Sequence, residues 1–599
     1  MSTRRGRPHR MAVVAIHLTA VIAIHLSAAV SASAETDLSG EWTPRYHEDL
    51  PERIPGPALG EYHGIPLNDA ARRRAESWSA SILSVLEHQC VPHPADYATR
   101  GPSHMRIWKE VDRNTQQLVA IRMRISAWGT ERAIWMDGRA HPPVYAAHTW
   151  QGFSTGEWNG NVLTVTTTHL KPGWIRRNGV PRSETAVLRE HFIRRGNHLT
   201  HISVIDDPAF LTEPFIRSQN WVLSPYQVIA PYPCDPAEEN AQPRHTVPHY
   251  LPGQNPYLRE YAQQQRLPLE GVAGGARTMY PEFVEGKDLR RTAAAPLAGS
   301  ASATTGRGNV SVVHVQGNVH MVHTPDGNMT VHAGEDGLLL VDTLRADRAA
   351  EIHAAIAPLS ASPIRYIVNT HAHESHTGGN GALAERGRTI YGGNAVNGVN
   401  RDAMGASARI LAHENTLLAM TSVGRASRDL PTDAFFSERK DLFFNGEGVH
   451  IAHLPAAHTS GDSLVYFRRS DVISAGDVFR THEFPFIDAD AGGTVQGVID
   501  ALNAIIDLAI PGPLQEGGTM VVPGRGRLSD ESDVVDYRDM VVIVRDRIRD
   551  GIDKGLSLPQ IQAARPTLGY DWQFGRSRTD WTGEHFVAAV YRDLTRTTR

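Results

Sequence analysis

Three histidines lie close together in residues 368–380, at His371, His373 and His376. On an irregular loop, imidazoles two residues apart can turn toward one point, whereas a helix needs a spacing of i and i+4. Neutral imidazole is the commonest protein ligand for zinc and related metals. The spacing therefore indicates a metal site on a loop, with a polar surface turn in a histidine-rich chain as the alternative interpretation.

The residues on either side of this loop indicate what holds it in place. The apolar run 364–368 predicts a buried strand before the histidines, and a short helix is predicted over 380–386 after Gly378 and Gly379. Ligands clustered on a loop after a rigid strand are a common arrangement in α/β folds.

Short strands and interspersed helices follow one another through the C-terminal half of the chain. Such an order predicts sheet layers covered by helices. The predicted strands are 310–316, 319–322, 329–333, 338–342, 364–368, 449–454, 463–467, 471–475 and 519–522, and the predicted helices are 345–357, 534–551 and 582–595.

Residues 35–255 have a different pattern, which predicts a β-rich N-terminal domain. Runs such as 161–169 and 198–206 approach the two-residue alternation of half-buried strands, and Asn159-Gly160 is a hairpin-type turn. We expect an antiparallel sheet or barrel, with a lipocalin-like barrel as one form of it. The segments 37–42 and 168–171 are similar to an uncharacterised β-rich domain of exported bacterial proteins, which implies no activity.

Length and composition place further limits on the chain. With 599 residues it should contain two or more domains, and a net charge of −5 without a long basic run does not favour nucleic acid as a partner. Residues 256–308 predict a flexible linker, because their end, 292–306, has almost no bulky side chains to bury.

The N-terminus predicts export. Four arginines up to Arg10, an apolar run over 11–30 and the small-residue site Ala32-Ser33-Ala34 together predict a signal peptide over 1–34. An uncleaved membrane anchor is the alternative; after cleavage we expect a periplasmic or secreted protein without membrane attachment. The two cysteines, Cys90 and Cys234, suit a single disulfide or a free buried pair.

Five segments of residues 309–548 resemble the metallo-β-lactamase superfamily. They are the histidine loop, in the place of the family's H-x-H-x-D-H motif, Ala456–Ser463 with His458, Gly476-Asp477, Val521–Gly526 with Arg525, and the strand that ends at Asp342. The resemblance implies an αββα sandwich, and so an α+β chain in which this sandwich follows the β-rich domain. Residues 549–599 would be a helical C-terminal extension.

The resemblance also implies a ligand set. His371, His373 and His458 would hold one zinc ion per chain, with an open position that suits catalysis. Water bound there has its pKa lowered to about 7, which gives a nucleophile for an acyl or ester carbon at neutral pH.

The second metal site of the family is incomplete in this sequence. Its usual aspartate is Ser375 and its last histidine is Arg525, so only His376 and Asp477 remain. A hydroxyl is a poor neutral ligand and a guanidinium cannot ligate at all, so at most one metal is expected in the usual place. Glu374 is a further candidate for a substitute ligand or base.

Two interpretations of Arg525 are open. Its charge could replace that of the second metal, pairing with Asp477 and binding a carboxylate or phosphate of the substrate. In the other interpretation the second site has decayed, and with it the group that orients the attacking water. Ser375, Asp477 and Arg525 are therefore the catalytic candidates beside the metal ligands.

Two hypotheses of function follow. The first is an exported zinc hydrolase that acts on an amide, ester or thioester of a small molecule, with activity reduced by the loss of the second site. The second is a catalytically inactive binding protein or scaffold. Neither the substrate nor the oligomeric state follows from the sequence, because substrate-contacting loops vary within one fold.

Overall fold

The computed structural model describes residues 36–45, 57–100, 104–126, 130–230, 234–237, 243–284, 310–389, 407–515, 517–575 and 581–597. The predicted signal peptide, residues 1–34, lies outside them. Among the helices of these residues, none combines the length and apolar character needed to span a membrane.

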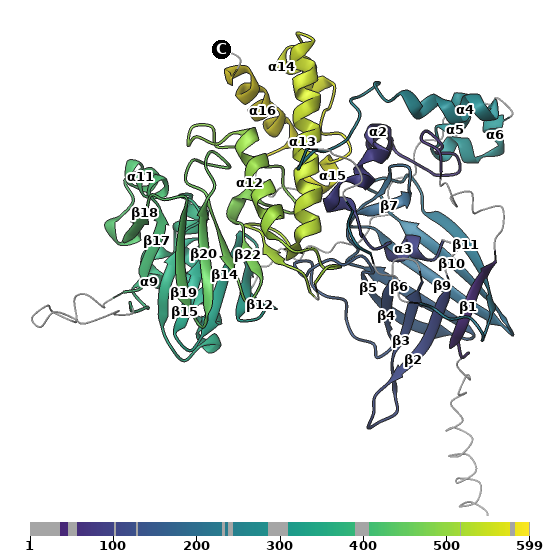
Figure 1. Ribbon diagram of the computed structural model, residues 1–599, viewed down its shortest axis with the longest axis horizontal. Coiled ribbons are helices and arrows are strands. Elements are labelled where there is room, and N and C mark those ends of the chain that lie inside the picture. The colour runs from purple at the N-terminus through teal and green to yellow at the C-terminus, as the bar shows by residue number, and fades with distance from the viewer. Residues whose placement is uncertain are drawn as a thin grey trace, which may run out of the picture.

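The N-terminal domain is a closed barrel of nine strands in the order β1-β11-β10-β9-β6-β5-β4-β3-β2 (Figure 1). This confirms the predicted β-rich, barrel-like fold. All neighbouring strands are antiparallel except β4 and β5. The strands are β1 Gly40–Arg45, β2 Met105–Val111, β3 Leu118–Ile125, β4 Glu131–Trp135, β5 Phe153–Asn159, β6 Val162–Thr168, β9 Val187–Arg195, β10 His198–Asp206 and β11 Phe215–Leu223.

The barrel forms because alternate side chains of each strand point to one packed core. In β10, for example, every second residue from Leu199 to Ile205 is buried. Large side chains such as Trp42, Phe192 and Trp221 fill this core. Outside the barrel, Cys90 and Cys234 form a disulfide, so the first of the two predicted states is the one observed.

The prediction of a flexible linker over 256–308 does not hold for residues 256–284. These residues form short helices: η4 Pro256–Arg259, α4 Glu260–Gln265, α5 Leu269–Val272, η5 Ala276–Met279 and α6 Pro281–Val284. The side chain of Val272 is buried and its carbonyl accepts a hydrogen bond from Tyr62 N (2.8 Å). A few apolar residues spaced along the segment are therefore enough to pack it against the barrel domain. Residues 285–309 lie outside the described residues.

The C-terminal half is the αββα sandwich that the resemblance implied. Its two sheets have the orders β12-β13-β14-β15-β16-β17-β18 and β19-β20-β21-β22-β23-β24. The strands are β12 Ser311–Gln316, β13 Val319–Thr324, β14 Gly327–Gly334, β15 Gly337–Val341, β16 Ile364–Val368, β17 Arg409–His413, β18 Asp433–Phe435, β19 Arg439–Phe444, β20 Glu447–His453, β21 Ser463–Phe467, β22 Val472–Ser474, β23 Met520–Val522 and β24 Ser529–Asp530.

Three apolar clusters build this sandwich. One lies between the two sheets and one lies under the helices of the first sheet, α7 Ala349–Ile356 and α9 Asn380–Ala384. The largest joins the second sheet to α12 Val495–Leu508, α13 Glu531–Asp553 and α16 Gly583–Thr597.

The predicted boundary at residue 548 falls inside α13. The buried face of this helix continues to Gly551, and Phe586 and Val590 of α16 belong to the same apolar cluster. The C-terminal extension is therefore part of the sandwich. Figure 1 shows α13 as the long yellow helix between the sandwich and the barrel.

A buried contact between a histidine and a glutamate connects the two sheets of the sandwich. His332 Nε2 of β14 lies 2.9 Å from Glu447 Oε1 of β20, and both side chains are almost fully buried. Glu447 also accepts hydrogen bonds from the backbone N–H and the hydroxyl of Ser470 (2.9 and 2.7 Å). Burial raises the pKa of Glu447, but the hydrogen bonds from His332 and Ser470 outweigh it and lower the pKa to about 2.

We predict that Glu447→Gln lowers the free energy of unfolding by about 3 kcal/mol at pH 7, because one partner of a buried pair loses its charge. Since the folded-state pKa of Glu447 is depressed, its contribution is present above the ordinary pKa of 4.5 and is lost as the pH falls toward 2. Urea unfolding should therefore show that the free energy of unfolding of Glu447→Gln is closer to that of the wild type at pH 3 than at pH 7. Glu385→Gln, at an exposed site, is the control, and an equal difference at both pH values would contradict the prediction.

Candidate metal centre

The loop that carries the first histidines is fixed by Asp342. This residue follows β15 and has a left-handed backbone conformation (φ 65°). Its carboxylate accepts from the backbone N–H and the hydroxyl of Thr370, both at 2.8 Å. β16 ends two residues before Thr370, so the chain enters the loop at a defined position next to the adjacent strand. His376, at the end of the loop in the short helix α8 Glu374–Thr377, donates from Nδ1 to Asp342 Oδ2 (2.7 Å).

The loop after β20 supplies His458. Helix α11 Glu414–Ser422 holds this loop, because the Asn415 amide donates to Ser460 O (2.9 Å) and the Thr416 hydroxyl donates to Gly461 O (2.9 Å). Gly461 lies so close to Thr416 that a Cβ would be 2.6 Å from the Thr416 hydroxyl oxygen. The segment that begins α11 thus positions the loop and contributes no ligand itself.

The structure brings His371, His373 and His458 together. One ring nitrogen from each lies within 4.8 Å of the others. The outward nitrogens have partners. His373 Nε2 donates to Asp488 Oδ2 (3.0 Å), and His458 Nδ1 donates to Asp462 Oδ1 (3.3 Å).

His371 is oriented by the same threonine that Asp342 holds. The Thr370 hydroxyl donates to Asp342, so it accepts from His371 Nδ1 (3.0 Å). Each imidazole of the cluster therefore has its outward nitrogen protonated, and its inward nitrogen carries a lone pair. Partners of this kind set the tautomer of metal-ligating histidines.

Two of the inward nitrogens provide the test of whether a metal fits. His371 Nε2 and His458 Nε2 are buried and have no hydrogen-bond partner among the described residues. Burying an unsatisfied polar atom costs about 1–3 kcal/mol, so a native fold rarely leaves two side by side. Burial also lowers the pKa of His371 well below its ordinary value, which keeps the ring neutral. A neutral set of three converging nitrogens fits a metal ion.

A second group, His371, His376 and Asp477, also lies within 4.8 Å, but cationic side chains already surround its carboxylate. His376 Nε2 is 3.2 Å from Asp477 Oδ1, Arg525 Nε is 3.8 Å from the same oxygen, and Arg480 donates to Oδ2. Burial lowers the pKa of His376, but the carboxylates of Asp477 and Asp342 outweigh it and raise the pKa to about 9. His376 is thus a cation between two carboxylates.

Arg480 is a site residue that the sequence did not reveal. It is buried, and besides Asp477 it binds Glu483 through Nη1 (2.9 Å). Asp462 and Asp488, which orient His458 and His373, were missed in the same way. Their signal in the sequence was proximity alone: Arg480 is three residues from Asp477, and Asp462 is four residues from His458.

The remaining predicted residues belong to neither group of possible ligands. Ser375 is half-buried in α8. The Glu374 side chain is largely exposed and faces Arg425, 3.7 Å away, so Glu374 is not a substitute ligand. The loop 483–488 contributes Phe486, whose ring centre is 5.7 Å from that of His458. Trp581 from the C-terminal extension packs on Phe486 (4.7 Å).

Comparison with known proteins gives the sandwich a family. Residues 325–512 match the family model described as the metallo-beta-lactamase superfamily. No curated protein matches the chain.

Among solved structures, the DIM-1 metallo-beta-lactamase and a metallo-beta-lactamase from Pontibacter korlensis are each 15% identical. Each match covers 39% of this chain, and 98% and 99% of those chains, with TM-scores of 0.30 and 0.29. The inverting sec-alkylsulfatase Pisa1 from Pseudomonas sp. is 15% identical over 47% of this chain, with a TM-score of 0.35. The match spans only half the length of that sulfatase. The match of residues 325–512 to the family model shows that the domain that carries His371, His373 and His458 belongs to the metallo-β-lactamase superfamily.

Proposed function

We propose that this protein is a zinc-dependent hydrolase that uses a single metal ion held by His371, His373 and His458. The observation that carries the proposal is the pair of buried imidazole nitrogens, His371 Nε2 and His458 Nε2, that converge without a hydrogen-bond partner in the part of the chain that the structure describes. Three neutral nitrogens with an open fourth position are a common ligand set of catalytic zinc. When bound, zinc would supply a Lewis acid for the scissile group and activate water at neutral pH.

The side chains beside the ligands would bind and orient the substrate. Arg525 is partly exposed, with 23% of its side chain accessible, whereas Arg480 is committed to the carboxylates of Asp477 and Glu483. Arg525 is therefore the group that can bind a carboxylate or phosphate of the substrate. Arg480 and His376 hold the pKa of Asp477 well below its ordinary value, against the effect of burial, so this carboxylate stays ionised and acts as a fixed acceptor.

The same charges support the loss of the second metal. A divalent ion near Asp477 would lie close to Arg480, Arg525 and the protonated His376, and like charges at such distances repel strongly in a buried site. The substrates we propose are amides, esters or thioesters of small molecules that carry an anionic group.

We also propose that the protein is exported to the periplasm or secreted. The disulfide between Cys90 and Cys234 supports this, because disulfides persist mainly in oxidising compartments.

We predict that the purified protein contains about one zinc per chain, as the tri-histidine site implies. His371→Ala and His458→Ala should remove it, whereas His376→Ala should retain it, because both ring nitrogens of His376 lie against carboxylates, those of Asp342 and Asp477. Metal analysis by mass spectrometry measures the content, with His353→Ala on α7 as the control. Two zinc ions per chain, with one lost in His376→Ala, would show that a second site exists.

We predict that Ser375→Asp combined with Arg525→His raises the zinc content toward two per chain. Arg480 donates to Asp477 Oδ2, whereas Oδ1 faces His376 and Arg525, so replacing Arg525 leaves Oδ1 available to an ion. The matched control is Ser375→Asn with Arg525→Gln, which removes the cation but adds no carboxylate or imidazole ligand. A content that stays at one would mean that Arg480 and His376 alone exclude the second ion.

We predict that Arg525→Gln lowers kcat/KM for a chromogenic β-lactam, which carries a carboxylate, by about tenfold or more, the value of one charge-assisted hydrogen bond. Hydrolysis of a neutral ester such as p-nitrophenyl acetate should stay unchanged. Steady-state kinetics on both substrates provides the measurement. Equal losses on the two substrates would contradict the anion-binding role, and bound zinc without turnover on any substrate would favour a binding protein or scaffold.

A further inference from the structure

Two segments that each carry a site arginine lie side by side. Arg480 and Arg525 pair as a parallel bridge, and Thr481 N donates to Arg525 O (3.2 Å). Arg527 N donates to the Thr481 hydroxyl (3.0 Å). The fit is close, because a Cβ on Gly526 would lie 1.9 Å from the Thr481 hydroxyl oxygen. These contacts hold the segments 480–483 and 523–528 together as one unit, so a group that binds one segment also restrains the other.

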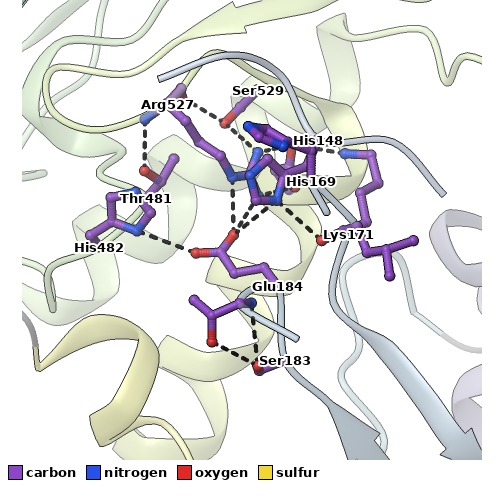
Figure 2. A network of polar contacts seen from close by, with 12 residues as sticks. His148, His169, Lys171, Ser183, Glu184, Thr481, His482, Arg527 and Ser529 are labelled. Atoms are coloured by element: carbon purple, nitrogen blue, oxygen red, sulfur yellow. Dashed lines mark hydrogen bonds and ion pairs between the residues drawn. The ribbon is translucent and has the colours of Figure 1, made fainter. Parts of the chain in front are cut away.

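One buried carboxylate of the barrel domain, that of Glu184, contacts both the segment 480–483 and the segment 523–528. Glu184 lies between β8 Val180–Arg182 and β9 of the barrel. It accepts from Arg527 Nε (3.0 Å), is 2.9 Å from Arg527 Nη2, and is 3.2 Å from His482 Nδ1. Figure 2 shows the Glu184 carboxylate between the Arg527 guanidinium and the His482 ring. Glu184 thus binds a residue of each segment, two positions from each site arginine.

A second part of the barrel domain holds the same unit from another side. Tyr145, in the connection between β4 and β5, accepts at its carbonyl from Leu528 N (3.0 Å), and its ring lies on His323 (centres 4.5 Å apart). His323 Nδ1 is 2.8 Å from the amide oxygen of Asn328. The Asn328 side chain then donates to the carbonyls of Pro523 (3.0 Å) and Gly526 (3.1 Å).

Glu184 is one of three carboxylates around the two buried cations Arg527 and Lys171. Arg527 also binds Asp533 through Nη1 and Nη2 (2.9 and 2.8 Å), and Lys171 binds Asp533 and Asp530 at the same distance (2.8 Å). Asp533 and Asp530 would balance the two cations without Glu184, so the part that Glu184 plays is in the contacts it makes. Its carboxylate joins Arg527 Nε to His482 Nδ1, and removing its charge weakens both of these charge-assisted contacts and with them the link between the two segments.

We propose that Glu184 of the barrel is a positioning residue for the metal site. Acting through Arg527 and His482, its carboxylate fixes the two segments that present Arg480 and Arg525 to Asp477. The role of Arg525 toward an anion rests on the proposed function, whereas the placement of the two segments does not. The barrel is then a part of the site, and the sandwich alone would hold its arginines loosely.

The first test measures backbone order in the full-length, zinc-loaded protein. Glu184→Gln should increase amide hydrogen exchange in 480–483 and 523–528 about tenfold or more, since local opening becomes easier. Glu190→Gln is the matched control, because Glu190 is also a buried barrel carboxylate bound by one arginine, Arg132, and one histidine, His201. Glu184→Asp should restore part of the protection. Unchanged exchange in Glu184→Gln, or an equal increase in Glu190→Gln, would overturn the proposal.

The second test asks whether Glu184 acts through Arg525. Inorganic phosphate is titrated into the cobalt-substituted protein, and its binding is followed by the visible spectrum. Glu184→Gln should weaken phosphate binding about tenfold, as Arg525→Gln does, and the double variant should be no weaker than Arg525→Gln alone, because residues that act as one unit are not additive. Additive losses would overturn the proposal. If the wild type responds to no phosphate and hydrolyses no substrate, the proposed function fails, and the exchange measurement still decides the positioning role.

Discussion

A buried carboxylate must be matched by positive charge, and Asp477 is the one on which the arrangement of this site depends. Taking an ion pair out of water costs several kcal/mol per ion unless geometry and hydrogen bonds compensate. Asp477 is 2% exposed, and His376, Arg480 and Arg525 surround it. In a two-metal site the ions themselves would supply this charge. Here protein side chains supply it, so the fold does not need a second ion to keep Asp477 buried.

Because side chains supply the positive charge around Asp477, the geometry of the site depends on the segments that hold these side chains. A metal ion orients its own ligands, whereas a guanidinium has to be held by the backbone that carries it. Arg480 is held by Glu483 and Asp477, but the segment with Arg525 is held by Asn328 of the sandwich and by Glu184 and Tyr145 of the barrel. The segment that carries Arg525 is therefore held in part by a second network of buried charge, which lies at the interface between the domains.

Local patterns predicted much of the fold and the centre of the site. The alternation in 198–206 predicted the strand β10, and the two-residue spacing of His371 and His373 predicted two candidate ligands, because both signals depend only on neighbours in the chain. The third candidate ligand, His458, followed from the family resemblance.

The groups that support the ligands could not be predicted, since they meet only in the folded chain. Glu184 and Arg527 are far apart in sequence, and the only local signal for Arg480 was its position three residues after Asp477. The error over 256–284 has the same cause. Residues such as Val272 bury themselves against a distant part of the chain, and composition alone does not reveal that contact.

The three-histidine cluster supports the proposal that the first metal site is retained. Asp462 and Asp488 orient His458 and His373 so that their lone pairs face inward, and His371 is set by Thr370. In a chain without metal this arrangement is unfavourable, since His371 Nε2 and His458 Nε2 lose their water and gain no protein partner. An ion that binds the folded state alone removes this cost and stabilises the fold by mass action. At the second site Asp477 Oδ1 also lacks a hydrogen-bond partner among the described residues, but the cations Arg480, Arg525 and His376 lie around this carboxylate, and they would repel an added ion.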